Sequence, residues 1–170
     1  MPTCPRCAAL ALVLLALAGC DSTNPGRDLA LIEGVYSLET LVFTPISSLP
    51  AADAGARLDP AGTSLEIFGD DETSLLRVRY RDATGSRRID LQTTASRGRA
   101  TFEAVDADDE ADLAALFLPR SFSLTYEGDS PRVLSGEFQQ TGVNLQAFDP
   151  TRYQGETNKS GTLTIRFRRP

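Results

Sequence analysis

The chain has 170 residues, with 17 Lys and Arg against 23 Asp and Glu, and it contains no His. A single domain usually takes about 100–200 residues, so we expect one folded domain. The absence of His excludes Ser-His-Asp and Cys-His catalysis, and the excess of acid argues against a nucleic-acid partner. With 41% hydrophobic residues, the chain is too apolar for intrinsic disorder and too polar for a polytopic membrane protein.

The first twenty residues have the organisation of a secretory signal. One basic residue, Arg6, precedes an unbroken apolar run over residues 8–18. This run is shorter than the roughly 20 residues that cross a bilayer, but it suits a signal peptide. The sequence Leu-Ala-Gly-Cys at 17–20 resembles the bacterial lipobox, which is cleaved before its Cys. The resemblance implies removal of residues 1–19, lipidation of Cys20 and a location in the cell envelope, on either the inner or the outer membrane.

The segment after the signal sets the expected domain boundaries. Residues 21–28 are polar and turn-rich, as in a short tether. We therefore expect a signal peptide over 1–19, a lipidated Cys and a tether over 20–33, and one folded domain over 34–170. The alternative is an ordinary signal peptide with a chance Cys. Cys4 and Cys7 have C-x-x-C spacing, but they lie in the segment expected to be removed.

Short alternating strands separated by turn residues make up most of the remaining sequence. In the clearest one, Leu76, Val78 and Tyr80 alternate with Arg residues, which predicts one buried face and one wet face. Long loops are expected over 44–62 and 149–161, and a turn at 141–142. The predicted strands are, in chain order, 34–43, 64–68, 75–81, 88–92, 100–104, 122–126, 133–138, 143–147 and 163–168.

Residues 106–118 break this pattern and predict one short helix near 108–118. Leu113 and Phe117 have helical spacing, Asp106 suits the N-cap, and acidic residues gather near the positive end of the helix dipole. The alternating acids also resemble the start of a calcium loop. That loop needs Gly at its sixth position and Glu at its twelfth, where this chain has Ala111 and Phe117, so no metal site is expected.

About nine short strands and one helix predict an all-β fold. An antiparallel meander of eight or nine strands, closed as a small barrel, protects the sheet edges, and a β-sandwich is the alternative. The start of this meander, Gly34-Val35-Tyr36, and its Arg-bearing last strand resemble the lipocalin-like lipoproteins. Members of that family usually begin with G-x-W, and the aromatic residue packs near a basic residue late in the chain. The resemblance implies that Tyr36 replaces the Trp, with Arg166 or Arg168 as its partner.

Five aromatic residues fall on faces expected to point into the barrel. A barrel of about eight strands is either filled by its own side chains or holds one small ligand. The many aliphatic residues on the same faces favour a filled interior. The candidate ligand-facing residues are Tyr36, Tyr80, Phe102, Tyr126 and Phe138.

Seven Arg residues gather between Arg77 and Arg99. One interpretation is a basic face for anionic lipid or polysaccharide. The favoured alternative is a wet barrel face on which Arg79 or Arg88 pairs with Asp90 across strands.

The sequence leaves two function classes. No spacing marks a nucleophile beside its base, so we expect no enzyme, and no cofactor is implied. The first class is a membrane-tethered binding or interaction module for a small apolar ligand or an envelope protein. The second is a structural or assembly lipoprotein with a solid barrel and no small-molecule ligand. An apolar cavity open at one end would favour the first class.

Overall fold

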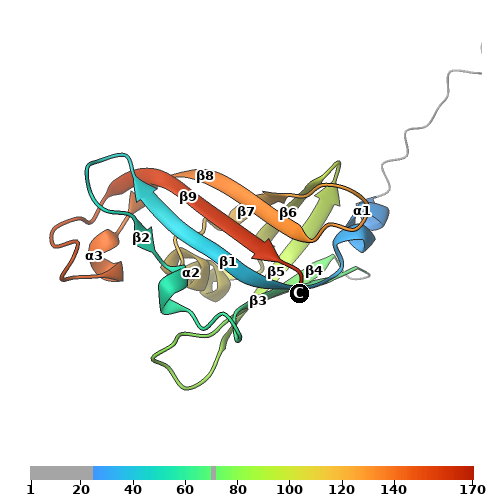
Figure 1. The fold of residues 1–170 in the computed structure, drawn as a ribbon, viewed down its shortest axis with the longest axis horizontal. Helices are drawn as coiled ribbons and strands as arrows, with labels where there is room; N and C mark the ends of the chain where they lie inside the picture. Colours follow the sequence, from blue (N-terminus) through green and yellow to red (C-terminus); the bar gives the residue numbers. More distant parts are fainter. Residues whose placement is uncertain (1–24, 70–71) are drawn as a thin grey trace, which may run out of the picture.

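Eight antiparallel strands close into a barrel in the computed structural model, which describes residues 25–69 and 72–170 (Figure 1). The strands pair in chain order, and β9 then returns to pair with β1. A ninth strand, β2 (Ala52–Asp53), lies outside the barrel on β1. The predicted barrel is confirmed. Its strands are β1 (Gly34–Pro45), β3 (Ser64–Phe68), β4 (Thr73–Val78), β5 (Arg87–Ser96), β6 (Arg99–Ala104), β7 (Ser121–Thr125), β8 (Val133–Val143) and β9 (Lys159–Arg168).

Alternation of side chains fixes the register of the strands. Leu76 on β4 lies opposite Ile89 on β5, and both side chains are buried. The neighbouring Arg77 and Arg88, also opposite each other, are exposed. A shift of one residue would turn the apolar set to solvent, so burial of one face specifies the pairing.

Side chains fill the barrel interior. Tyr36, Phe43, Phe102 and Phe167 are among its largest fully buried residues. An internal void beside Leu76 measures about 10 Å³. A cavity needs roughly 10–15 Å³ to hold even one water molecule. This barrel therefore has the filled interior that the sequence favours.

The predicted helix forms as α2 (Ala107–Ala115). The Asp106 carboxylate accepts the backbone N–H groups of Asp108 and Asp109, each at 2.9 Å, and so caps the helix as expected. Asp109 is itself buried and accepts the N–H of Asp90 at 2.9 Å, which joins α2 to β5. Burial raises the pKa of the Asp109 carboxyl above its usual range.

A second helix, α1 (Pro25–Ile32), lies within the segment expected to be a tether. Leu29 and Ile32 on this helix are fully buried. The Asp28 carboxylate accepts the N–H of Arg97 at 2.9 Å, at the turn between β5 and β6. Arg97 has φ of 52°, a left-handed conformation that is uncommon for residues other than Gly. The folded part therefore begins before residue 34, where the sequence predicts the domain to start.

The prediction of a separate strand over 143–147 is wrong. β8 continues to Val143, and α3 (Leu145–Phe148) follows it. The Asn144 side chain accepts the N–H of Ala147 at 2.9 Å and begins this helix. At 141–142 the structure has a bulge within β8 in place of the expected turn, because the pairing with β9 skips these two residues. The long loop over 44–62 also contains β2 and a short 3₁₀-helix, η1 (Gly55–Arg57).

Candidate functional site: a pocket at the barrel mouth

The two ends of the barrel differ. Figure 1 shows α1 at one end and α2 and α3 towards the other. At the α1 end, the hydroxyl of the buried Tyr36 donates to the carbonyl of Ile32 at 3.0 Å. The Arg169 guanidinium donates to the same hydroxyl at 2.7 Å and lies 4.8 Å from the ring centre. Burial raises the pKa of Tyr36 although Arg169 opposes the shift, so the hydroxyl stays protonated at neutral pH.

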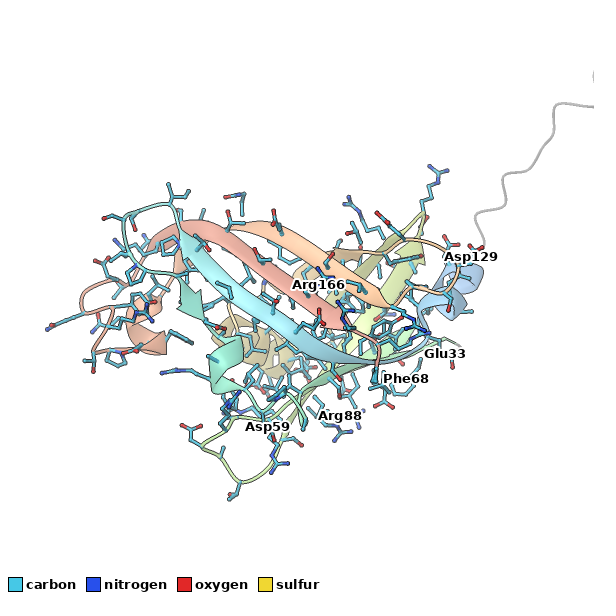
Figure 2. All side chains as sticks on the ribbon, in the orientation of Figure 1. Glu33, Asp59, Phe68, Arg88, Asp129 and Arg166 are labelled. Atoms are coloured by element: carbon cyan, nitrogen blue, oxygen red, sulfur yellow. The ribbon has the colours of Figure 1, made fainter. Side chains whose placement is uncertain are left out.

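The expected partners of Tyr36, Arg166 or Arg168, were wrong: the partner is Arg169, one residue beyond Arg168. Arg166 and Arg168 alternate with the buried Phe167, so they point outward, where both pair with Glu39. Figure 2 shows Arg166 on this outer face. Arg169 follows the last residue of β9, so its side chain does not have to follow the alternation between inner and outer faces along the strand. It can therefore reach Tyr36.

The opposite end holds an open pocket of about 480 Å³, which we call the mouth pocket. Its size falls in the range of roughly 300–1,000 Å³ typical of small-ligand sites. Four separate parts of the chain line it: Arg57 of η1; Tyr80; Ala114, Ala115, Phe117 and Leu118 of the α2 region; and the segment from the end of β8 into α3, which contributes residues 140–144, Ala147 and Phe148.

Phe117 forms the floor of the mouth pocket from a strained position. The Leu118 N–H donates to Leu113 O and the Phe117 N–H to Ala114 O, both at 3.0 Å, which is the Schellman pattern that ends α2. Gly usually occupies this left-handed position, yet Phe117 has φ of 64°. Such a conformation costs about 1–3 kcal/mol for other residues and is concentrated at functional sites.

Aromatic packing offsets this strain. The Phe117 ring lies 5.6 Å from that of Phe43 in the barrel and 5.1 Å from that of Phe148 on α3, measured between centroids. The left-handed turn therefore aims an aromatic ring at the junction between the filled interior and the mouth pocket.

Arg57 is the one charged residue among those lining the pocket. Its guanidinium lies over the Phe148 ring, 4.1 Å from the centroid, in a cation–π contact. Among the described residues it makes no ion pair. The mouth pocket therefore combines an apolar floor with one cation at its rim, a combination that suits an amphipathic anion.

The structure does not gather the five predicted aromatic residues into one site. Phe102 is fully buried and stacks on Phe122 at 5.3 Å, and Phe138 meets the edge of Phe122 at 6.2 Å. Tyr36 lies at the α1 end, as described above, and Tyr126 is also buried. Tyr36, Phe102 and Tyr126 are therefore core residues, and the partly buried Phe138 packs against the core.

Tyr80 alone lies at the mouth pocket. β4 ends at Val78, two residues before Tyr80, which forms an isolated bridge with Leu58. Its side chain is half-buried, and burial raises the pKa of its hydroxyl, with the nearby Arg87 opposing the shift. The strand expected over 75–81 was therefore too long, and Tyr80 does not point into the middle of the barrel.

The Arg-rich stretch does not form one basic face. Arg79 pairs with Asp59 at 3.5 Å and Arg87 pairs with Asp112. Arg88 pairs with Asp90 at 2.8 Å, but along β5, so the expected cross-strand pair is wrong. The residue opposite Arg88 on β4 is Arg77. Three of the seven Arg residues therefore pair with local acids, which favours the alternative of a wet barrel face.

Comparison with family models, with curated proteins and with solved structures finds no match to this chain. Within residues 25–69 and 72–170, no helix is long and apolar enough to cross a membrane. Nor does that part of the chain contain a group of three acidic, His or Cys side chains placed to hold a metal ion. Cys20 lies outside the described residues.

Proposed function

We propose that this protein is a membrane-tethered binding or interaction module of the cell envelope whose ligand binds at the mouth pocket. The observation that carries the proposal is the contrast between the barrel interior and the mouth pocket. The interior void is about 10 Å³, whereas the mouth pocket is about 480 Å³ and has an apolar floor. A ligand held inside the barrel has no space, so binding is assigned to the mouth.

The position of α1 supports this assignment. α1 follows the expected lipid anchor in the chain and lies at the opposite end of the barrel from α2 and α3 (Figure 1). An anchor at the α1 end leaves the mouth pocket facing away from the membrane, towards ligands in the surrounding compartment. We further propose a lipocalin-like relationship, which the contact between Tyr36 and a basic residue late in the chain supports.

A structural or assembly lipoprotein with a solid barrel is the second candidate. The filled interior favours it, because a rigid barrel needs no cavity to act as a scaffold. The two candidates differ in whether the mouth pocket takes up a ligand.

The anionic aromatic dye 1-anilinonaphthalene-8-sulfonate tests the mouth pocket directly. We expect saturable, one-to-one binding to the mature chain carrying Cys20→Ser, measured by fluorescence titration. Ala147→Trp should abolish binding by filling the pocket, since Ala147 lines it and is exposed. Arg57→Gln should weaken binding about tenfold, because a hydrogen bond to a charged group contributes about 1.5–3 kcal/mol.

Arg79→Gln is the matched control for the dye experiment, because Arg79 is exposed and lies outside the mouth pocket. Its affinity should equal that of the parent chain. Dye binding that survives Ala147→Trp would place the dye elsewhere and favour the structural candidate.

We predict that Cys20 carries lipid and is the first residue of the mature chain. Stable anchoring needs at least two acyl chains or an equivalent second signal, and a lipidated N-terminal Cys supplies them. Mass spectrometry of the membrane-extracted protein should show an acylated Cys20. Cys20→Ala should release the protein from membranes, and retention of that variant after a salt wash would count against the prediction.

A further inference from the structure

The geometry points to an extended peptide segment with a free C-terminal carboxylate as the ligand of the mouth pocket, added as a strand to the unpaired edge of β8. This inference rests on the proposed function and names its ligand class. Three features of the described residues carry it: an uncovered strand edge, an apolar floor beside that edge, and a cation without a carboxylate partner.

The unpaired edge of β8 begins after Gly136, where the carbonyl oxygen of Ser123 on β7 still lies 2.9 Å from the position that a Cβ atom would take. The pairing of β7 with β8 consists of Thr125 opposite Ser135, whereas β8 and β9 pair from Val133 to Gln140 without interruption. The Thr125 hydroxyl donates to the carbonyl of Ser135 at 3.0 Å, so that carbonyl points towards β7. Backbone groups in a strand alternate between its two edges, so the backbone of Gln139 also points to that side. β7 begins at Ser121 and pairs with nothing on β8 beyond Ser135.

The bulge at the end of β8 extends this edge into the mouth pocket. Gln140 pairs with Gly161 and Val143 with Lys159, so the two residues between them have no partner on β9. These residues, Thr141 and Gly142, are exposed and line the pocket. Within the described residues, no strand covers their backbone. Such an edge accepts an extended chain, whose own N–H and C=O groups complete the ladder.

The pocket beside this edge suits peptide side chains. Leu118 and the strained Phe117 offer an apolar floor, and Phe148 extends it towards α3. A strand places alternate side chains on one face, so every second residue of the added chain meets this floor. The volume of about 480 Å³ accommodates a few residues and not a folded domain.

Arg57 supplies the charge for the end of that chain. It lies at the rim, stacked on Phe148, and the described acidic residues leave it without an ion pair. A guanidinium binds a carboxylate through two parallel hydrogen bonds. A peptide that ends in the pocket offers such a carboxylate.

A library of random heptapeptides displayed with free carboxyl ends tests the inference on the mature chain carrying Cys20→Ser. We expect enrichment of sequences with apolar residues at alternate positions. The most enriched peptide is then synthesised as the free acid, as the C-terminal amide and with N-methyl groups at alternate residues. Fluorescence anisotropy measures each form against the parent chain, Arg57→Gln and the control Arg79→Gln.

Strand addition predicts that alternate N-methylation weakens binding at least tenfold in one of the two registers, because it removes the ladder N–H donors. Amidation of the peptide and Arg57→Gln should each lower the affinity about tenfold. The two changes combined should lower it no further than either one alone, and Arg79→Gln should leave the affinity unchanged. N-methylation changes the ligand and leaves the protein intact, so misfolding of a variant cannot produce the result.

Failure of the inference is distinguishable from failure of the proposed function. If no peptide is enriched, or N-methylated peptides bind as well as the parent peptide in both registers, strand addition is overturned. Binding of the anionic dye to the mouth pocket would in that case still support a small amphipathic ligand. An amide that binds as tightly as the free acid would overturn the role assigned to the C-terminal carboxylate.

Discussion

Replacing Phe102 with Ala should lower the free energy of unfolding by about 3–5 kcal/mol, the range for truncation of a large buried aromatic side chain. Phe102 is fully buried and stacks on Phe122 at 5.3 Å, so its truncation removes close-packed contacts from the core. For a domain of this size the melting temperature should fall by about 6–20 °C. Urea denaturation of the mature Cys20→Ser chain measures the effect.

Phe68→Ala is the control for this loss. Phe68 is 39% exposed at the end of β3, so its truncation should change the free energy of unfolding by well under half as much as Phe102→Ala. Equal effects at the two positions would mean that the interior is not close-packed. A ligand inside the barrel would then return as a candidate.

The barrel strands were predictable because their signal is local. In β4 and β5, apolar and charged residues alternate, and one buried face makes that alternation necessary. α2 was predictable for a similar reason, since Asp106, the acidic first turn and the apolar spacing all lie within one short segment. For each of these elements, the residues that predict it are consecutive in the chain.

The other helices were not predictable from local pattern. α1 has eight residues and α3 has four, too few for a helical period to stand out. α3 also contains Leu145 and Ala147, which alternate as a strand would. In the structure, the Asn144 side chain accepts the N–H of Ala147 and so caps a helix. An Asn side chain can form the same hydrogen bond in a turn, so the sequence alone does not distinguish the two.

The mouth pocket depends on contacts between distant residues. Arg57, Tyr80, Phe117 and Phe148 belong to four segments that only the closed barrel brings to one end. Phe117 was identified as a helix residue, but its left-handed conformation contradicts the usual preference for Gly at that position. Tertiary packing against Phe43 overrides that preference, and no sequence pattern reports such packing.

Arg169 shows the same limit at the α1 end. Alternation along β9 correctly separates the outward Arg166 and Arg168 from the inward Phe167. It says nothing about the residue after the strand ends, and that residue is the partner of Tyr36. Arg169 also donates to the carbonyl of Glu33, so it links the start of β1 to the end of β9 where the barrel closes.

The hydroxyl of Tyr36 should contribute measurably to stability, and its ring should contribute more. Tyr36→Ala removes a fully buried ring and should cost about 3–5 kcal/mol. Tyr36→Phe keeps the ring but leaves the carbonyl of Ile32 and the guanidinium of Arg169 without this partner, which should cost about 1–3 kcal/mol. Urea denaturation at pH 7 measures both variants.

Tyr126→Phe is the control for Tyr36→Phe, because it removes a buried tyrosine hydroxyl that makes no hydrogen bond within the described part of the chain. The Tyr126 hydroxyl is buried, yet it has no hydrogen-bond partner among the described residues. Burial raises the pKa of both Tyr126 and Tyr36, so both hydroxyls are neutral at pH 7 and the two Phe variants remove the same group. Because an unsatisfied buried hydroxyl is destabilising, Tyr126→Phe should leave stability unchanged or raise it slightly. Equal losses from Tyr36→Phe and Tyr126→Phe would show that the bridge from Arg169 through Tyr36 to Ile32 does not hold the barrel closed.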